Sequence, residues 1–134
     1  AKQIDALRAN YQAAGVQAEC VPFIGDMARA YADADLVICR AGATTVAEIA
    51  AIGAAALFVP FPHAVDDHQT TNARFLVDAG GGWLVQQADM TPRGLADMLL
   101  NMERSALLER ALKAKNMQKT QATREVVSAC EELA

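Results

Sequence analysis

Residues 36–53 read LVICRAGATTVAEIAAIG and contain one complete unit of strand, turn and helix. Its first four residues, Leu36 to Cys39, form a continuous apolar run, which is typical of a strand buried on both faces of a parallel sheet. Gly42 allows the turn that follows the strand, and a helix is predicted from about Thr44 to Ile52, where Gly53 ends it. This unit predicts an α/β fold built on a parallel sheet.

The segments before and after this unit repeat the alternation of strand and helix. We predict strands over 16–23, 57–59 and 83–85, and helices over 1–14, 26–33 and 67–79 and from about 92, 105 and 121 onward. Thr91 is predicted to cap a helix that has Pro92 in its first position, and Ser105 to cap the next one. Such alternation produces right-handed crossovers and a parallel sheet with helices on both sides. The predicted fold is a Rossmann-like α/β domain that ends in a helical segment.

Size and composition exclude several classes of function. A chain of 134 residues suits one compact domain, and its net charge of −4 argues against a nucleic-acid partner, which needs a basic surface. No stretch approaches the roughly 20 apolar residues that span a bilayer, and the charged first ten residues are not a secretion signal. Cys20, Cys39 and Cys130 include no Cys-x-x-Cys pair, which favours a reducing compartment. We therefore expect a cytosolic domain.

The loop that follows residues 36–39 forms a candidate anion site. In an open parallel sheet, ligands bind at the loops that follow the carboxyl ends of the strands. Gly42 permits a turn that other residues resist, the small residues from Ala41 to Thr44 allow close approach, and the amides of a helix N-terminus favour a diphosphate. Glu48, about one turn further on, is placed to accept hydrogen bonds from a ribose diol. An ordinary turn with a solvated Glu48 fits equally well, because a single glycine is a weak signal.

The loop over residues 60–72 carries a dense group of polar side chains. Gln69 and Asn72 lie three residues apart and share a helix face, which suits them to read sugar hydroxyls. Asp66 or Asp67 is predicted to cap this helix. A proline-bounded, capped turn with no ligand is a further interpretation of the same loop.

A metal site in this loop is a weaker alternative. Its ligands would be His63, Asp66, Asp67 and His68. The two histidines are five residues apart and fall on different helix faces, and no cysteine or further carboxylate cluster completes a ligand set. We therefore predict no metal ion in this loop.

A third loop, residues 21–27, could cover a planar base. Phe23 and Met27 offer apolar surface, and the backbone of Ile24 offers one donor and one acceptor to the edge of the base. Packing of Phe23 and Met27 in the core is the alternative, and periodicity alone favours it. No Ser-His-Asp or Cys-His set and no acid/base pair of carboxylates stands out, so the residues alone do not identify a substrate.

The three loops together resemble a known family. The matching motifs are residues 23–27 (FIGDM), 40–49 (RAGATTVAEI), 58–61 (FVPF), 67–69 (DHQ) and 72–73 (NA). This series resembles the C-terminal domain of the MurG family, two-domain GT-B glycosyltransferases, from about Val16 almost to the end of the chain. The resemblance implies transfer of N-acetylglucosamine from UDP-N-acetylglucosamine to lipid I, forming lipid II of peptidoglycan, by an inverting reaction with no cofactor and no bound metal.

The resemblance also implies a role for each matching residue. The backbone of Ile24 would pair with uracil beside Phe23 and Met27, and Glu48 would hold the ribose hydroxyls. Gln69 would bind the hydroxyls of the sugar, with His68 at a position where some relatives carry a second glutamine. The remaining substrate-binding residues of the matching motifs are Arg40, Gly42, Ala43, Thr44, Thr45 and Asn72, of which Gly42 to Thr45 would hold the diphosphate.

The sequence also departs from the family pattern. Ala41 stands where serine is common, and Ala54-Ala55 replaces a turn that usually contains proline. The first strand and glycine-rich loop of the donor domain, and the whole acceptor domain, are not in the sequence. We therefore expect residues 1–134 to be an N-terminally truncated donor domain that is inactive alone, with lipid I bound by the other domain and the full protein peripheral on the cytoplasmic face of the inner membrane.

Two other functions remain open at this point. A UDP-N-acetylglucosamine 2-epimerase shares the two-domain architecture, and it would need acid/base residues, for which His63 and His68 are the candidates. A non-catalytic nucleotide-sugar-binding module would use the same pocket. Product analysis with the nucleotide sugar alone separates the epimerase, because an epimerase needs no acceptor.

Overall fold

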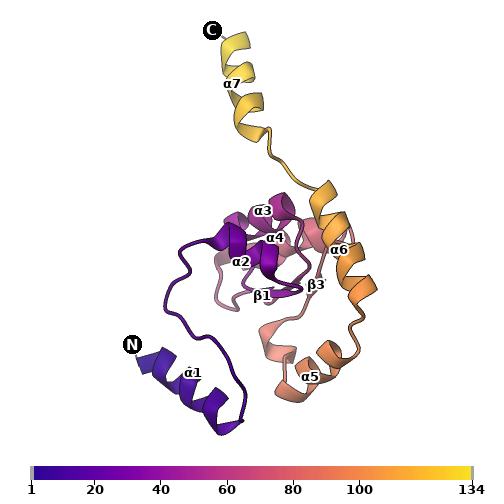
Figure 1. Cartoon of the computed structure of the whole chain (residues 1–134). Coiled ribbons are helices and arrows are strands. Elements are labelled where there is room, and N and C mark those ends of the chain that lie inside the picture. The colour runs from indigo at the N-terminus through magenta and orange to yellow at the C-terminus, as the bar shows by residue number, and fades with distance from the viewer. Residues whose placement is uncertain (1, 134) are drawn as a thin grey trace.

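The computed structural model describes residues 2–133 and is built around a parallel sheet of three strands (Figure 1). The strands are β1 (Val37–Cys39), β2 (Ala56–Phe58) and β3 (Trp83–Leu84), in that spatial order. Val37 lies opposite Ala56, and Leu57 lies opposite Trp83. The predicted parallel α/β sheet is confirmed.

The helices follow the predicted order along the chain. They are α1 (Lys2–Ala13), α2 (Met27–Asp33), α3 (Ala43–Ile52), α4 (His68–Val77), α5 (Pro92–Leu100), α6 (Arg104–Asn116) and α7 (Ala122–Glu132), with short 3-10 turns η1 (Val65–Asp67) and η2 (Gln87–Asp89). Figure 1 shows α3 and α4 on one side of the strands and α5 on the other, while α1 and α7 stand away from this core. No described helix is long and apolar enough to cross a membrane.

Local sequence accounts for several helix ends. Asp26 caps α2 by accepting a hydrogen bond from the amide of Arg29 at 3.0 Å, and Thr91 caps α5 through the amide of Gly94 at 3.0 Å. Gly53 ends α3 in the left-handed conformation, with φ of 79°, and donates its N–H to the carbonyl of Ile49. Gly53 and Thr91 agree with the sequence prediction, whereas Asp26, predicted as the first residue of its helix, is the N-cap that precedes it.

The core depends on small residues that let helices approach the sheet. Phe58, Ile49 and Leu76 are fully buried at its centre. Gly81 lies against α6 so closely that a Cβ there would come within 2.9 Å of the backbone nitrogen and Cα of Ala114. The small residues Gly81 and Ala114 therefore allow the close packing that fixes the position of α6 on the rest of the domain.

Two sequence predictions are wrong and a third lies partly outside the described residues. Residues 16–23 form no strand: this segment has no paired strand beside it in the described part of the chain, and a strand without a partner leaves its backbone groups unpaired. Ser105 does not cap α6, whose N-cap is Glu103; the hydroxyl of Ser105 instead donates to the Glu103 carboxylate at 3.3 Å. The predicted first residue of the N-terminal helix, Ala1, is outside the described range.

Candidate functional site

The N-terminus of α3 lies directly after β1 and carries no side-chain cap. Its N-cap is Gly42, which has no side chain to offer the amides of the first turn. The backbone of Gly42 is ordinary, with φ of −63° and ψ of 148°, so the prediction that this turn needs a glycine conformation is wrong. A Cβ at Gly42 would meet only the Thr45 hydroxyl, at 3.8 Å. Glycine therefore supplies open space in front of the helix amides.

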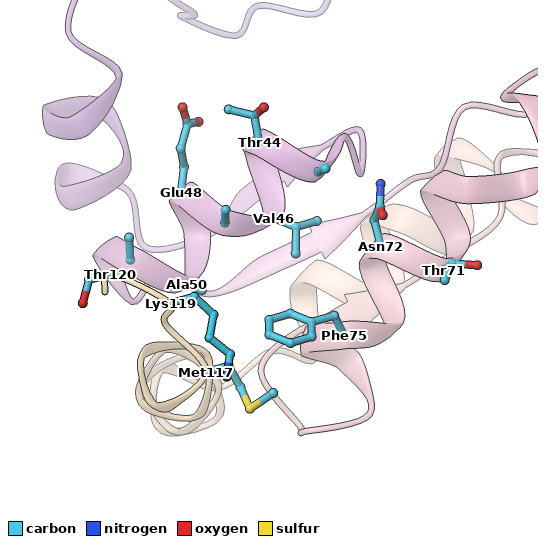
Figure 2. Close-up of a pocket in the computed structure, with 13 residues that line it drawn as sticks. Thr44, Val46, Glu48, Ala50, Thr71, Asn72, Phe75, Met117, Lys119 and Thr120 are labelled. Carbon is cyan, nitrogen blue, oxygen red and sulfur yellow. The ribbon is translucent and has the colours of Figure 1, made fainter. Parts of the chain in front are cut away.

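A cavity of about 640 Å³ runs from this helix to α4 and the end of α6 (Figure 2). That volume is within the range of small-molecule sites. Among the predicted site residues, it is lined by Ala43, Thr44, Glu48 and Asn72. Figure 2 shows Thr44 and Glu48 projecting from α3 on the same side, while Phe75 and Met117 form an apolar end. The structure thus brings together predicted residues from two loops.

The predicted base-covering loop lies apart from this cavity lining. Phe23 is 83% exposed and Ile24 is also exposed. Met27 begins α2 and packs against the buried core. The alternative of core packing therefore holds for Met27 but not for Phe23, which offers a bare aromatic ring to a ligand.

Two amide side chains of α4, Gln69 and Asn72, hydrogen-bond to the loop between β1 and α3. The Oε1 atom of Gln69 accepts hydrogen bonds from the amides of Ala41, at 3.2 Å, and Phe61, at 2.9 Å. The Nδ2 atom of Asn72 donates to the carbonyl of Ala41 at 3.1 Å. The carbonyl end of Gln69 is therefore occupied, and its Nε2 atom has no partner among the described residues. Gln69 is oriented so that it can only donate to a ligand.

Arg40, which follows β1, hydrogen-bonds to the segments that follow β2 and β3. One guanidinium nitrogen donates to the carbonyls of Val59, at 3.1 Å, and Pro60, at 3.0 Å, beyond β2. The other donates to Oε1 of Gln87 beyond β3 at 2.6 Å. The guanidinium also lies 5.6 Å from the centroid of the Phe61 ring. These contacts direct Arg40 at the protein itself, so it orders the loops of the site.

Glu48 has a partner that sequence reasoning missed. The hydroxyl of Tyr31, on α2, donates to Oε2 of Glu48 at 3.1 Å. Burial, followed by the hydrogen bond to Glu48, its charge and that of Cys39, raises the pKa of Tyr31 to about 12. Burial also raises the pKa of the Cys39 thiol to about 11. Tyr31 stands out in the alanine-rich α2, which is the one signal that the sequence offered.

The aspartates before α4 form a tight turn. Asp66 and Asp67 both have left-handed backbones, with φ of 52° and 50°, and Asp67 is the N-cap without a side-chain bond to a helix amide. Its Oδ1 instead accepts from the hydroxyl of Thr70 at 2.6 Å, and Thr70 in turn accepts from Gln86 at 3.0 Å. In the part of the chain that the structure describes, no three His, Cys, Asp or Glu residues gather as a metal site would require. His68 is exposed beside this turn.

Comparisons with known proteins agree on one family. The family model described as glycosyltransferase family 28 C-terminal domain matches residues 2–130. Relatives from Polaromonas sp. and Paracidovorax citrulli are 76% and 74% identical over 99% and 98% of this chain, which covers 34% and 37% of their lengths. Both are named UDP-N-acetylglucosamine--N-acetylmuramyl-(pentapeptide) pyrophosphoryl-undecaprenol N-acetylglucosamine transferase. The crystal structure of Acinetobacter baumannii MurG is 47% identical with a TM-score of 0.90, over 97% of this chain and 38% of that one. The chain thus spans little more than a third of the length of these relatives.

Proposed function

The chain belongs to the glycosyltransferase family 28 C-terminal domains, and from this premise we propose that it binds UDP-N-acetylglucosamine as the donor domain of an N-acetylglucosaminyltransferase. In the complete protein, the sugar would pass to lipid I with inversion and form lipid II. One observation carries the proposal: the uncapped N-terminus of α3 and the carboxylate of Glu48 belong to the same helix and border one cavity. A nucleoside diphosphate carries the two matching groups, an anion and a ribose diol.

The diphosphate would lie against the first turn of α3. Ala43, Thr44 and Thr45 supply amides there, and the bare Gly42 lets phosphate oxygens approach them. Helix amides and the helix dipole favour negative charge at this end. They would favour it more as the bond to the sugar breaks and charge accumulates on the leaving UDP. This group of residues therefore supports transfer without a metal ion in the site.

The other parts of the donor would lie on either side of the diphosphate. Glu48 would accept hydrogen bonds from the ribose. The backbone of Ile24 would pair with the edge of uracil, beside the exposed ring of Phe23. Gln69 would donate its free Nε2 to a sugar hydroxyl, because its carbonyl end is held by the backbone. A fixed donor at this point can distinguish hydroxyl configurations, which supports selection of the gluco sugar.

The same comparison supports our assignment of the domain. The relatives are nearly three times as long as this chain, which covers 34% of one and 37% of another. We place the lipid I site and peripheral contact with the cytoplasmic face of the inner membrane in the remaining part of such a protein. Residues 1–134 would then bind donor but would not catalyse transfer alone.

Calorimetric titration with UDP-N-acetylglucosamine and its galacto epimer tests the proposal. The chain should bind the gluco compound more tightly, and Glu48→Ala should weaken binding of both by about tenfold, as expected for hydrogen bonds to a charged group. Glu131→Ala, an exposed change on α7 outside the cavity, is the matched control and should leave affinity unchanged. Equal binding by wild type and Glu48→Ala, or no binding by a folded sample, would refute the proposal.

A further inference from the structure

Helix α2 connects the predicted base-binding loop to the predicted ribose carboxylate. Its first residue, Met27, follows the loop that carries Phe23 and Ile24, and Tyr31 lies one turn further along the helix. Tyr31 is only 7% exposed and belongs to the buried core. Its hydroxyl nevertheless reaches the edge of the site, where it donates to Glu48 on α3 at 3.1 Å.

The direction of this hydrogen bond is fixed at neutral pH. Burial and the neighbouring carboxylate raise the pKa of Tyr31 to about 12, so its hydroxyl keeps its proton and acts as the donor. The other titratable group beside it, the Cys39 thiol, has a pKa raised to about 11 by burial and is likewise uncharged. Glu48 therefore accepts from a rigid, neutral donor.

The contact limits what Glu48 can do. A glutamate on a helix surface ordinarily samples several rotamers, and ordering such a side chain on binding costs conformational entropy. Here Oε2 is held by a hydroxyl whose ring is locked in the core. Oε1 accepts no hydrogen bond from the described residues and stays available to a ligand. The carboxylate is thus set in one orientation before a diol arrives.

We propose that Tyr31 is a positioning residue that orients Glu48 and thereby sets the preference of the site for a ribonucleotide over a 2′-deoxyribonucleotide. The inference rests on the proposed function, because it takes Glu48 as the acceptor for the ribose hydroxyls. Tyr31 itself does not touch the nucleotide. Recognition of the base and of the ribose is then coupled through the single short helix α2, which carries Met27 at one end and Tyr31 near the other.

The test compares UDP with 2′-deoxy-UDP as probes, titrated into the wild-type chain and Tyr31→Phe. The substitution removes only the hydroxyl and keeps the buried ring. Tyr11→Phe, an exposed tyrosine on α1, is the matched control. Far-ultraviolet circular dichroism and thermal denaturation confirm that each variant is folded.

We expect the wild type to prefer UDP by about tenfold, the value of one hydrogen bond to a charged group. Tyr31→Phe should lower that preference to about two- to threefold, chiefly by weakening UDP, and Tyr11→Phe should leave it unchanged. In a Glu48→Ala background, Tyr31→Phe should have no further effect on the preference. A purely structural role of Tyr31 would instead weaken both nucleotides equally.

The results that would overturn the inference differ from the results that would overturn the proposed function. If wild type prefers UDP and Tyr31→Phe keeps that preference, Tyr31 does not position Glu48, but the proposed donor site stands. If Tyr31→Phe also lowers the preference in the Glu48→Ala background, it acts by a route other than Glu48. If wild type binds neither probe, or binds both equally, the assignment of Glu48 to the ribose fails and this inference fails with it.

Discussion

Replacement of Gln69 by leucine should destabilise the domain, whereas replacement by glutamate should not. Leucine keeps the approximate volume of the side chain but removes the oxygen that accepts from Ala41 and Phe61. Glutamate retains an acceptor at that position, and a carboxylate accepts stronger hydrogen bonds than an amide does. It also lies in the first turn of α4, where negative charge is favoured.

The size of the effect follows from the burial of the two amides. Ala41 is fully buried, so water cannot replace its lost partner, and an unsatisfied buried amide costs about 1–3 kcal/mol. Phe61 is 43% exposed, so its amide can be hydrated, and its loss is about 0.5–1 kcal/mol. Gln69→Leu should therefore lower the free energy of unfolding by about 1.5–4 kcal/mol, or Tm by roughly 5–15 °C for a domain of this size.

Urea and thermal denaturation, followed by circular dichroism, measure the difference. Gln118→Leu, at an exposed position after α6, is the control for the change of residue type. Gln69→Glu should keep wild-type stability yet bind UDP-N-acetylglucosamine poorly, because the Nε2 donor is gone. If Gln69→Leu is as stable as the control, or if Gln69→Glu unfolds as readily as Gln69→Leu, the shared acceptor does not hold these loops together.

Three further changes follow from packing and ionisation. Gly81→Ala should lower the free energy of unfolding in urea by about 1–3 kcal/mol, because its Cβ would lie 2.9 Å from backbone atoms of Ala114 that cannot move aside. Iodoacetamide at neutral pH should modify the exposed Cys130 well before Cys39, whose pKa burial raises to about 11, as timed peptide mass spectrometry would show. The pKa of Tyr31 rises from 10.0 to about 12 on folding, so Tyr31 ionises more readily in the unfolded chain. Its contribution to stability is therefore complete below pH 10.0 and is lost as the pH rises toward 12. Thermal denaturation across that range should show a smaller loss for Tyr31→Phe than for wild type.

Matched controls separate these effects from general damage. Gly25→Ala, where a Cβ would meet nothing within 4 Å, should leave stability nearly unchanged. Tyr11→Phe should lose as much stability at alkaline pH as wild type does. Equal losses for Gly81→Ala and Gly25→Ala, equal alkylation rates of the two cysteines, or the same alkaline profile for Tyr31→Phe and wild type would contradict the respective prediction.

The central strands and helix ends were predictable because their causes are local. Apolar runs at residues 36–39 and 57–59 lie within one residue of β1 and β2. All three residues of β2 are buried, as expected for a strand covered on both faces, but the same expectation for β1 is wrong: β1 lies at the edge of the sheet and its Ile38 is 45% exposed. Gly53 and Thr91 end or begin helices through their own backbone or side chain. Residues 16–23 have the composition of a strand, but a strand also needs a paired neighbour, which no local pattern can reveal.

The candidate site was predictable in its parts but not in its internal contacts. Spacing placed Gln69 and Asn72 on one face of α4, but it could not show that both grip Ala41, which lies 28 and 31 residues earlier. Gly42 was predicted to adopt a backbone conformation that other residues resist, but its backbone is in the ordinary extended region. The bond between Tyr31 and Glu48 depends on how α2 and α3 pack, which sequence spacing cannot show. The roles of the predicted binding residues stay predictions.

The contacts of Arg40 have a consequence for the thermodynamics of binding. Its guanidinium donates to the carbonyls of Val59 and Pro60 and to the side chain of Gln87, and these bonds restrict the loops that follow β2 and β3. The conformational entropy of the loops is then lost during folding, and little remains to be lost when a nucleotide arrives. We therefore expect a preorganised site: association should proceed with a small entropic penalty, and the affinity of the domain should depend in part on the contacts that Arg40 makes within the protein.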